Sequence, residues 1–270
     1  MTDASLPPMD PNEAPLPEPV QMSGLSFQGL ISKVKTATRP NSLAILGKFK
    51  SGKTTLAASA YEIPGLRNAG KDVLILEAET GTASIAEQYP EVDQVPINDI
   101  QSFEQAKYEL INNPHNYGVV IVDTFDKFQE MKVETALRIG ASNTQAAWGD
   151  VKDWTIKTAW DLHKAPFLTI FLFHEVTEKN DQSAKWETSF AIQGGAKPKL
   201  GQVFDLIGHL TVRTDANGKA IRTLQVGPQT GNVTGSRYES ALPSTIDNPT
   251  VPTIFEMIEA HRNNRTEGAK

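Results

Sequence analysis

The segment from Gly47 to Thr54 has residue types and a spacing that could bind the phosphate groups of a nucleotide. It reads Gly-Lys-Phe-Lys-Ser-Gly-Lys-Thr and fits the pattern Gly-x-x-x-x-Gly-Lys-Ser/Thr in full. Glycines let the backbone turn so that successive N–H groups point at phosphate, and the dipole of a following helix favours the negative charge. Lys53 is expected to reach the β- and γ-phosphates, and the Thr54 hydroxyl to bind Mg²⁺. A chance match is the alternative, which the expected strand before the loop and helix after it argue against. We therefore expect these residues to line the nucleotide site: Gly47, Lys48, Phe49, Lys50, Ser51, Gly52, Lys53, Thr54 and Thr55.

An acid at the end of an apolar run could supply the second half of this site. Asp123 follows the run from Val119 to Val122 directly. A carboxylate at this place can hold Mg²⁺ opposite Thr54. The alternative is that Asp123 only caps the next helix. Its pairing with a phosphate-binding loop favours the metal role.

Two further positions could take part in hydrolysis of a bound nucleotide. Glu79 lies in the turn Glu77-Ala-Glu79-Thr-Gly that follows the second expected strand. A carboxylate there could orient and polarise the attacking water as a general base, although Glu77 or a merely solvated loop acid are the alternatives. His174 ends the apolar run from Thr169 to Phe173. It could sense the γ-phosphate, or it could be an ordinary polar group at a strand end.

The pattern of apolar segments predicts an α/β fold. Short apolar strands alternate with helical segments, and the β-branched run from Gly118 to Val122 is typical of a parallel strand covered on both faces. After residue 200, Asn217-Gly218 lies between two strand-like segments and predicts an antiparallel hairpin. The expected strands are 42–46, 72–77, 92–97, 118–122, 167–173, 206–214 and 220–226, and the expected helices are 54–60, 102–112, 124–139, 148–163 and 253–261.

Composition divides the chain into tails and one folded domain. Residues 1–24 contain six prolines and four acids but no Lys or Arg, so they bury too little apolar surface to fold. They carry most of the formal net charge of −6, which leaves the body nearly neutral. We expect an acidic tail over 1–24, a domain over 25–262 and a second flexible tail over 263–270.

Several classes of protein are disfavoured by composition. The chain has no cysteine, which excludes disulfides, thiolate metal sites and cysteine nucleophiles. No apolar run approaches the length of a membrane span, and the start of the chain does not resemble a signal peptide. The five histidines show no metal-ligand spacing. We expect a cytoplasmic protein without a membrane partner.

These elements together resemble the RecA-like ATPase core, and within that group the core-only RecA-like proteins of phages. That group includes phage nucleotide-binding AAA-type ATPases and single-strand annealing proteins. The resemblance runs from about Pro40 to Pro243. It implies a three-layer P-loop NTPase with a mostly parallel RecA-like sheet and a C-terminal antiparallel hairpin, located in the cytoplasm of a bacterial host. It also implies that ATP and Mg²⁺ are bound, with Lys53, Glu79, Asp123 and His174 as the catalytic residues.

In the RecA family, the loop that follows the strand carrying the γ-phosphate sensor binds single-stranded DNA. Here that loop runs from about Glu175 to Gly201. Aromatic rings that stack on bases and lysines that contact phosphates are typical of such binding. The alternative is an insertion with its own hairpin around Trp186, because four acids offset the lysines. The resemblance implies DNA contacts by Lys179, Lys185, Trp186, Phe190, Lys197 and Lys199.

The same resemblance implies a homo-oligomer whose ATP sites lie between subunits. Such a head-to-tail contact produces a ring or a filament. A basic residue of the neighbouring subunit completes each site in this family. The sequence leaves four candidates for that residue: Arg213, Lys219, Arg222 and Arg237.

Three functions compete at this point. The first is an ATP-dependent protein that binds single-stranded DNA and promotes annealing or recombination. The second is an ATP-switched loader or adaptor for a helicase or a single-strand binding protein, with the acidic tail as the partner-binding part. The third is a small-molecule P-loop kinase. Such kinases need a lid rich in Arg to hold the transferred phosphate, and residues 175–201 contain no Arg, which disfavours this function. No guanine-reading Asn-Lys-x-Asp motif occurs, so ATP is favoured over GTP.

Overall fold

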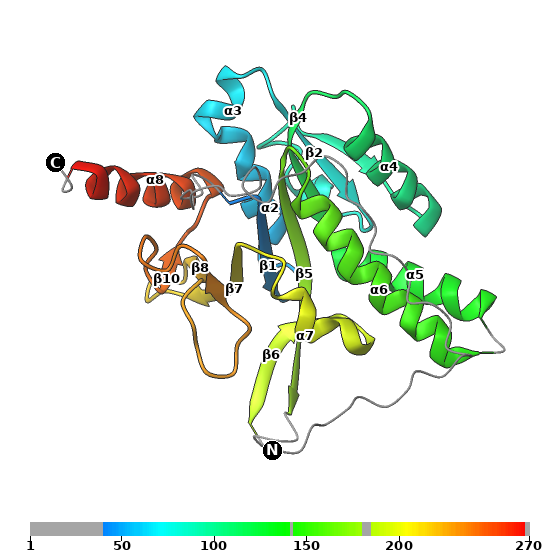
Figure 1. Cartoon of the computed structure of the whole chain (residues 1–270). Coiled ribbons are helices and arrows are strands. Elements are labelled where there is room, and N and C mark those ends of the chain that lie inside the picture. The colour runs from blue at the N-terminus through cyan, green and yellow to red at the C-terminus, as the bar shows by residue number, and fades with distance from the viewer. Residues whose placement is uncertain (1–39, 141–142, 180–184, 268–270) are drawn as a thin grey trace, which may run out of the picture. The chain divides into compact units, whose positions relative to one another are not determined.

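The computed structural model describes residues 40–140, 143–179 and 185–267 (Figure 1). The expected tail over residues 1–24 lies outside these residues. The strands are β1 (Ser42–Gly47), β2 (Asp72–Glu77), β3 (Asp93–Pro96), β4 (Tyr117–Asp123), β5 (Leu168–Lys179), β6 (Trp186–Phe190), β7 (Leu206–Thr214), β8 (Ala220–Gln225), β9 (Gly235–Ser236) and β10 (Thr245–Asp247). The α-helices are α2 (Lys53–Ala58), α3 (Pro64–Asn68), α4 (Ile100–Asn112), α5 (Phe125–Ile139), α6 (Thr144–His163), α7 (Lys197–Leu200) and α8 (Val251–Glu267). Short 3-10 turns are η1 (Ser59–Glu62), η2 (Thr82–Ser84) and η3 (Gly194–Ala196).

The described strands form one mixed sheet with a parallel centre. Its order is β10-β8-β7-β1-β5-β4-β2-β3, and all pairs from β7 to β3 are parallel. Strands β8 and β10 extend one edge in antiparallel fashion. The predicted three-layer α/β fold with a C-terminal antiparallel hairpin is therefore confirmed.

Alternation along the central strands divides the core between the two faces of the sheet. In β1, Leu43 and Ile45 pack on one face, where α2, η1 and α8 cover the sheet. Ala44 and Leu46 pack on the other face beneath α4, α5 and α6. Figure 1 shows these two helical layers on either side of the strands. Because both faces are covered, the central strands consist of nearly continuous apolar residues.

Strand β5 is longer than the sequence predicted. It continues past Phe173 to Lys179 and forms an antiparallel hairpin with β6. Figure 1 shows this hairpin extending beyond the ends of the neighbouring strands. Residues 175–179 and 185–201 of the expected loop are therefore structured, and the alternative of a hairpin around Trp186 is the one that the structure bears out.

The C-terminal helix also differs from expectation. Helix α8 continues to Glu267, past the predicted end at residue 261 and into the segment expected to be a flexible tail. None of the helices in the described ranges has the length and apolar character needed to cross a membrane.

Candidate active site

The phosphate loop lies between β1 and α2, at the carboxyl edge of the parallel strands. Lys50 has a φ of 60° and Gly52 a φ of 95°, so the loop passes twice through the left-handed region that glycine adopts at the lowest cost. The Lys53 ammonium donates to the carbonyl oxygens of Gly47 and Lys48, both at 3.0 Å. Burial lowers the pKa of Lys53, while the charge of Asp123 opposes this shift. The lysine is thus held inside the loop, where a phosphate group would meet it.

Thr54 and Asp123 are adjacent, although they come from different elements. The Thr54 hydroxyl donates to Asp123 Oδ2 at 2.7 Å. Strand β4 ends at Asp123 and lies next to β5, which itself pairs with β1, and this order brings the acid to the loop. Burial raises the pKa of Asp123 to about 6, although the Thr54 hydrogen bond and the Lys53 charge both act to lower it.

These residues suit Mg²⁺ bound together with a nucleotide. Ser51 Oγ is buried and has no hydrogen-bond partner in the part of the chain that the structure describes, as expected of a group that faces a ligand. Within the described ranges no cluster of three or more His, Asp or Glu side chains could hold a metal alone. Mg²⁺ commonly takes one or two protein ligands and completes its shell with phosphate oxygens and water. Thr54 and Asp123 are a set of this kind.

The two acids of the turn after β2 have different environments. Glu77 is buried and accepts hydrogen bonds from the backbone N–H of Thr82 at 2.8 Å and from its hydroxyl at 2.9 Å. Glu77 therefore stabilises the turn. Glu79 is more exposed, and its Oε2 lies 3.7 Å from His174 Nε2. The geometry favours Glu79 over Glu77 as the group that meets a water molecule.

His174 is held by an acid that sequence reasoning missed. Asp126, in the first turn of α5, accepts from the His174 backbone N–H at 2.9 Å and contacts His174 Nδ1 at 2.7 Å. The centroid of the Phe49 ring lies 4.0 Å from the centroid of the His174 imidazole. With Nδ1 engaged by Asp126, His174 Nε2 is the nitrogen that faces Glu79. The prediction that His174 ends its strand is wrong, because β5 continues to Lys179.

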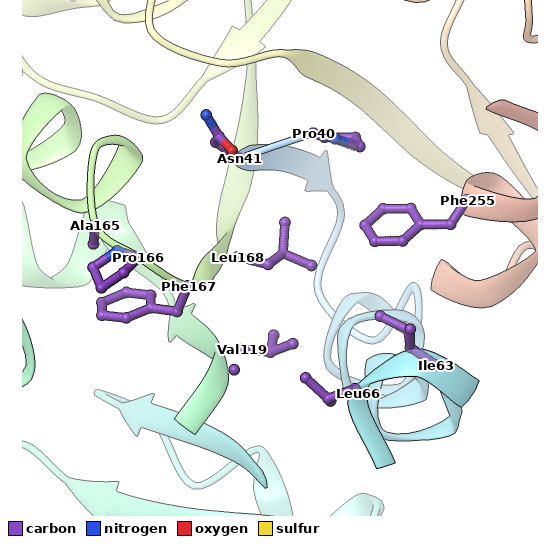
Figure 2. A pocket seen from close by; sticks show the side chains of 11 residues that line it. Pro40, Asn41, Ile63, Leu66, Val119, Ala165, Pro166, Phe167, Leu168 and Phe255 are labelled. Carbon is purple, nitrogen blue, oxygen red and sulfur yellow. The ribbon is translucent and has the colours of Figure 1, made fainter. Parts of the chain in front are cut away.

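Two cavities differ in how well their linings suit a nucleotide. One, of about 480 Å³, adjoins the phosphate loop and is lined by Lys48, Phe49, His174, Glu175 and Thr177. The other, of about 290 Å³, lies at the opposite, amino ends of β1, β4 and β5. Figure 2 shows its mainly apolar lining. No titratable side chain lines this second cavity, so it does not suit a phosphate group.

The residues predicted to bind DNA lie on different elements and in different environments. Trp186 is 67% exposed and pairs with Lys179 at the end of the hairpin. Phe190 is instead completely buried, with its ring 4.5 Å from that of Phe173. Its predicted role as a base-stacking residue is therefore wrong, since β6 turns this side chain into the core. Lys185 directly precedes β6, whereas Lys197 and Lys199 lie on α7, and Lys197 is paired with Glu178 at 2.8 Å.

Two of the four candidate basic residues are paired within the chain. Arg213 binds Asp247 at 2.7 Å, and Arg237 binds Asp205 at 2.6 Å. Lys219 lies in the turn between β7 and β8, and Arg222 lies against the phosphate loop.

Comparison with known proteins identifies the domain that carries this site. A family model described as an AAA domain matches residues 39–238, which include the phosphate loop, Asp123, His174 and the hairpin. The chain belongs to this family of P-loop ATPases. Helix α8 lies outside the matched AAA domain. The prediction of a P-loop ATPase is thus confirmed, whereas kinship with the phage annealing proteins stays a prediction.

A KaiC-like protein from the hyperthermophilic archaeon Pyrococcus horikoshii OT3 matches with 12% sequence identity and a TM-score of 0.38. The match covers 70% of this chain and 79% of the other. Among curated proteins, none matches.

Proposed function

We propose that this AAA domain binds and hydrolyses ATP, and that the bound nucleotide controls binding of single-stranded DNA for annealing or recombination in phage DNA metabolism. The observation that carries the proposal is the position of His174. It faces Glu79 at the phosphate loop and lies on β5, the strand that continues into the exposed hairpin. One strand therefore links the expected γ-phosphate position to the expected DNA-binding surface.

The hydrolytic roles follow from the geometry of the chain's own residues. The phosphate loop binds the phosphate chain through its backbone N–H groups, and Lys53 adds a positive charge beside it. Thr54 and Asp123 would hold Mg²⁺, which when bound neutralises negative charge on the phosphate oxygens. Glu79 orients a water molecule and accepts its proton as the water oxygen bonds to the γ-phosphorus and the bond to ADP breaks. His174, with Nδ1 held by Asp126, presents Nε2 to the same region.

The hairpin supplies the support for DNA binding. Trp186 offers an exposed aromatic face on which a base can stack, and Lys179 lies opposite it. The hairpin is also bound to α7 through the pair of Lys197 with Glu178. A change at His174 can therefore reach both Trp186 and the lysines of α7 through strand β5.

We further propose that the protein forms a ring or filament and cooperates with a single-strand binding protein. A head-to-tail arrangement of this kind uses two different surfaces of each subunit. Lys219 is exposed and lies in the β7–β8 turn, where it could reach a neighbouring subunit.

Fluorescence anisotropy of a labelled oligo-dT tests the DNA-binding part. We expect binding that depends on Mg-ATP and weakens with added salt, because phosphate contacts release counterions. Trp186→Ala should weaken binding by about tenfold, the worth of one stacked base. The matched control is Tyr108→Ala, which removes an exposed aromatic ring on helix α4. Full affinity in the Trp186 variant would remove the hairpin assignment.

The same titration separates the alternative functions. If the protein binds Mg-ATP but no DNA at low salt, the loader or adaptor function is favoured. The acidic side chains of the hairpin, such as Glu178 and Glu187, are compatible with that outcome. A pull-down of a helicase or single-strand binding protein with chain lacking residues 1–24 would then test whether the acidic tail binds the partner.

A further inference from the structure

Arg222 touches the phosphate loop of its own chain. Its Nε donates to the carbonyl oxygen of Ser51 at 3.1 Å. The neighbouring Gly52 has no side chain, and a Cβ atom there would clash with Arg222 Nε. Gly52 thus serves two needs, since its φ of 95° also favours glycine. The guanidinium group packs directly on the loop that is expected to hold phosphate.

The backbone of Arg222 is fixed from a second direction. Its N–H donates to Asn248 Oδ1 at 3.2 Å, and its carbonyl oxygen accepts from the Asn248 N–H at 2.6 Å. Asn248 has a φ of 45°, a conformation that is uncommon outside glycine but that Asn adopts more readily than most residues. Strand β8 also pairs with β7 on one side and β10 on the other. The arginine is therefore positioned by both its main chain and its side chain.

The outer nitrogens of this guanidinium have no partner in the described part of the chain. In the AAA domain Arg213 and Arg237 each bind a carboxylate, whereas Arg222 makes a side-chain bond through Nε alone. The same Ser51 whose carbonyl oxygen Arg222 contacts has a buried Oγ with no partner among the described residues. A guanidinium fork is well suited to bind phosphate through two nitrogens.

We propose that Arg222 binds the phosphate groups of the nucleotide held by its own chain, in cis. This assignment rests on the proposed ATP binding and gives the same site a further positioning residue. It also removes Arg222 from the candidates for the basic residue that a neighbouring subunit would supply. One side chain cannot lie on its own phosphate loop and in the site of another subunit at the same time.

Binding of a fluorescent ATP analogue, with Mg²⁺ present, tests the assignment. Arg222→Gln should raise the Kd by about tenfold, as expected for loss of one charge-assisted contact, and make the salt dependence of binding shallower. Arg222→Lys keeps the charge and should lie between this variant and the parent. The matched control is Arg67→Gln, which removes an exposed arginine from helix α3. Equal thermal midpoints without nucleotide would show that the variants are folded.

Three outcomes are distinguishable. A Kd within twofold of the parent in Arg222→Gln, with binding lost in Lys53→Ala, overturns the Arg222 assignment alone. A weaker Kd with an unchanged salt dependence also overturns it, because it indicates that Arg222 only shapes the loop. Absence of binding in the parent defeats the proposed function itself.

Mixing the Arg222→Gln and Lys53→Ala variants separates action in cis from action in trans. Arg222→Gln subunits keep Lys53, and Lys53→Ala subunits keep Arg222. If Arg222 acts on its own loop, no subunit of the mixture has both groups, and ATP hydrolysis stays at the sum of the separate rates. Recovery of hydrolysis on mixing would show that Arg222 serves a neighbouring subunit and would overturn the proposal.

Discussion

Replacement of Asp123 by Asn should stabilise the protein in the absence of nucleotide while abolishing its magnesium-dependent activity. The carboxylate is buried, and burial raises its pKa from 3.8 to about 6. Charging this group inside the protein therefore costs free energy that the neutral amide avoids. The amide oxygen can still accept the hydrogen bond from Thr54 that Asp123 now receives.

The magnitude follows from the displaced pKa. At about 1.4 kcal/mol for each pKa unit, the difference between 3.8 and about 6 corresponds to about 3 kcal/mol. Between these two values the folded state binds more protons than the unfolded state, so stability falls as pH rises through this window. The full cost is present above about pH 6, roughly half of it at pH 5, and none of it well below the unfolded value of 3.8.

Thermal unfolding between pH 5 and pH 8 measures this effect. Asp123→Asn should melt about 6 to 12 °C above the parent at pH 7.5, given about 2 to 4 °C per kcal/mol for a domain of this size. The gain should shrink at pH 5. As a control, Glu87→Gln neutralises an exposed acid and should leave the melting temperature unchanged. A gain that is absent, or that does not depend on pH, would show that the buried charge of Asp123 does not destabilise the folded protein.

The remaining predictions concern the chemistry around the phosphate loop. Glu79→Gln should keep ATP binding, measured with a fluorescent analogue, but lower the hydrolysis rate by about 10²-fold; normal turnover would exclude Glu79 as the base. Asp126→Asn should lower the same rate by about 10²-fold, because an amide cannot hold His174 Nδ1 as the carboxylate does; equal loss of ATP affinity would instead indicate a damaged site. Gly52→Ala should abolish ATP binding, since the new methyl group clashes with Arg222 at a left-handed position; calorimetric binding at the parental Kd would contradict this.

Most of the fold could be predicted from the sequence because the central strands consist almost entirely of apolar residues. Val119 to Val122 are apolar on both faces, and only a strand covered on two sides needs such a run. The Asn217-Gly218 pair between two strand-like segments likewise indicated the C-terminal hairpin. The phosphate loop was recognisable because its chemistry depends on a contiguous segment.

The rest depended on contacts between distant segments. The extension of β5 from Glu175 to Lys179 is polar except for Val176, and such a segment looks like a loop until β6 pairs with it. Asp126 has no local signal, because its role comes from His174, 48 residues away. Arg222 reaches Ser51 across 171 residues, so sequence spacing alone left it among the arginines of a possible subunit contact.

Release of inorganic phosphate from Mg-ATP by the purified protein shows whether the phosphate loop belongs to a working ATPase site. The measurement compares the parent with Lys53→Ala, in which the charge inside the phosphate loop is lost, and with Lys71→Ala as a control that removes a lysine outside the proposed site. We expect steady release by the parent and the control, and none above background by the Lys53 variant. Equal release by all three proteins, or none by the parent, would contradict the assignment of this site as an ATPase.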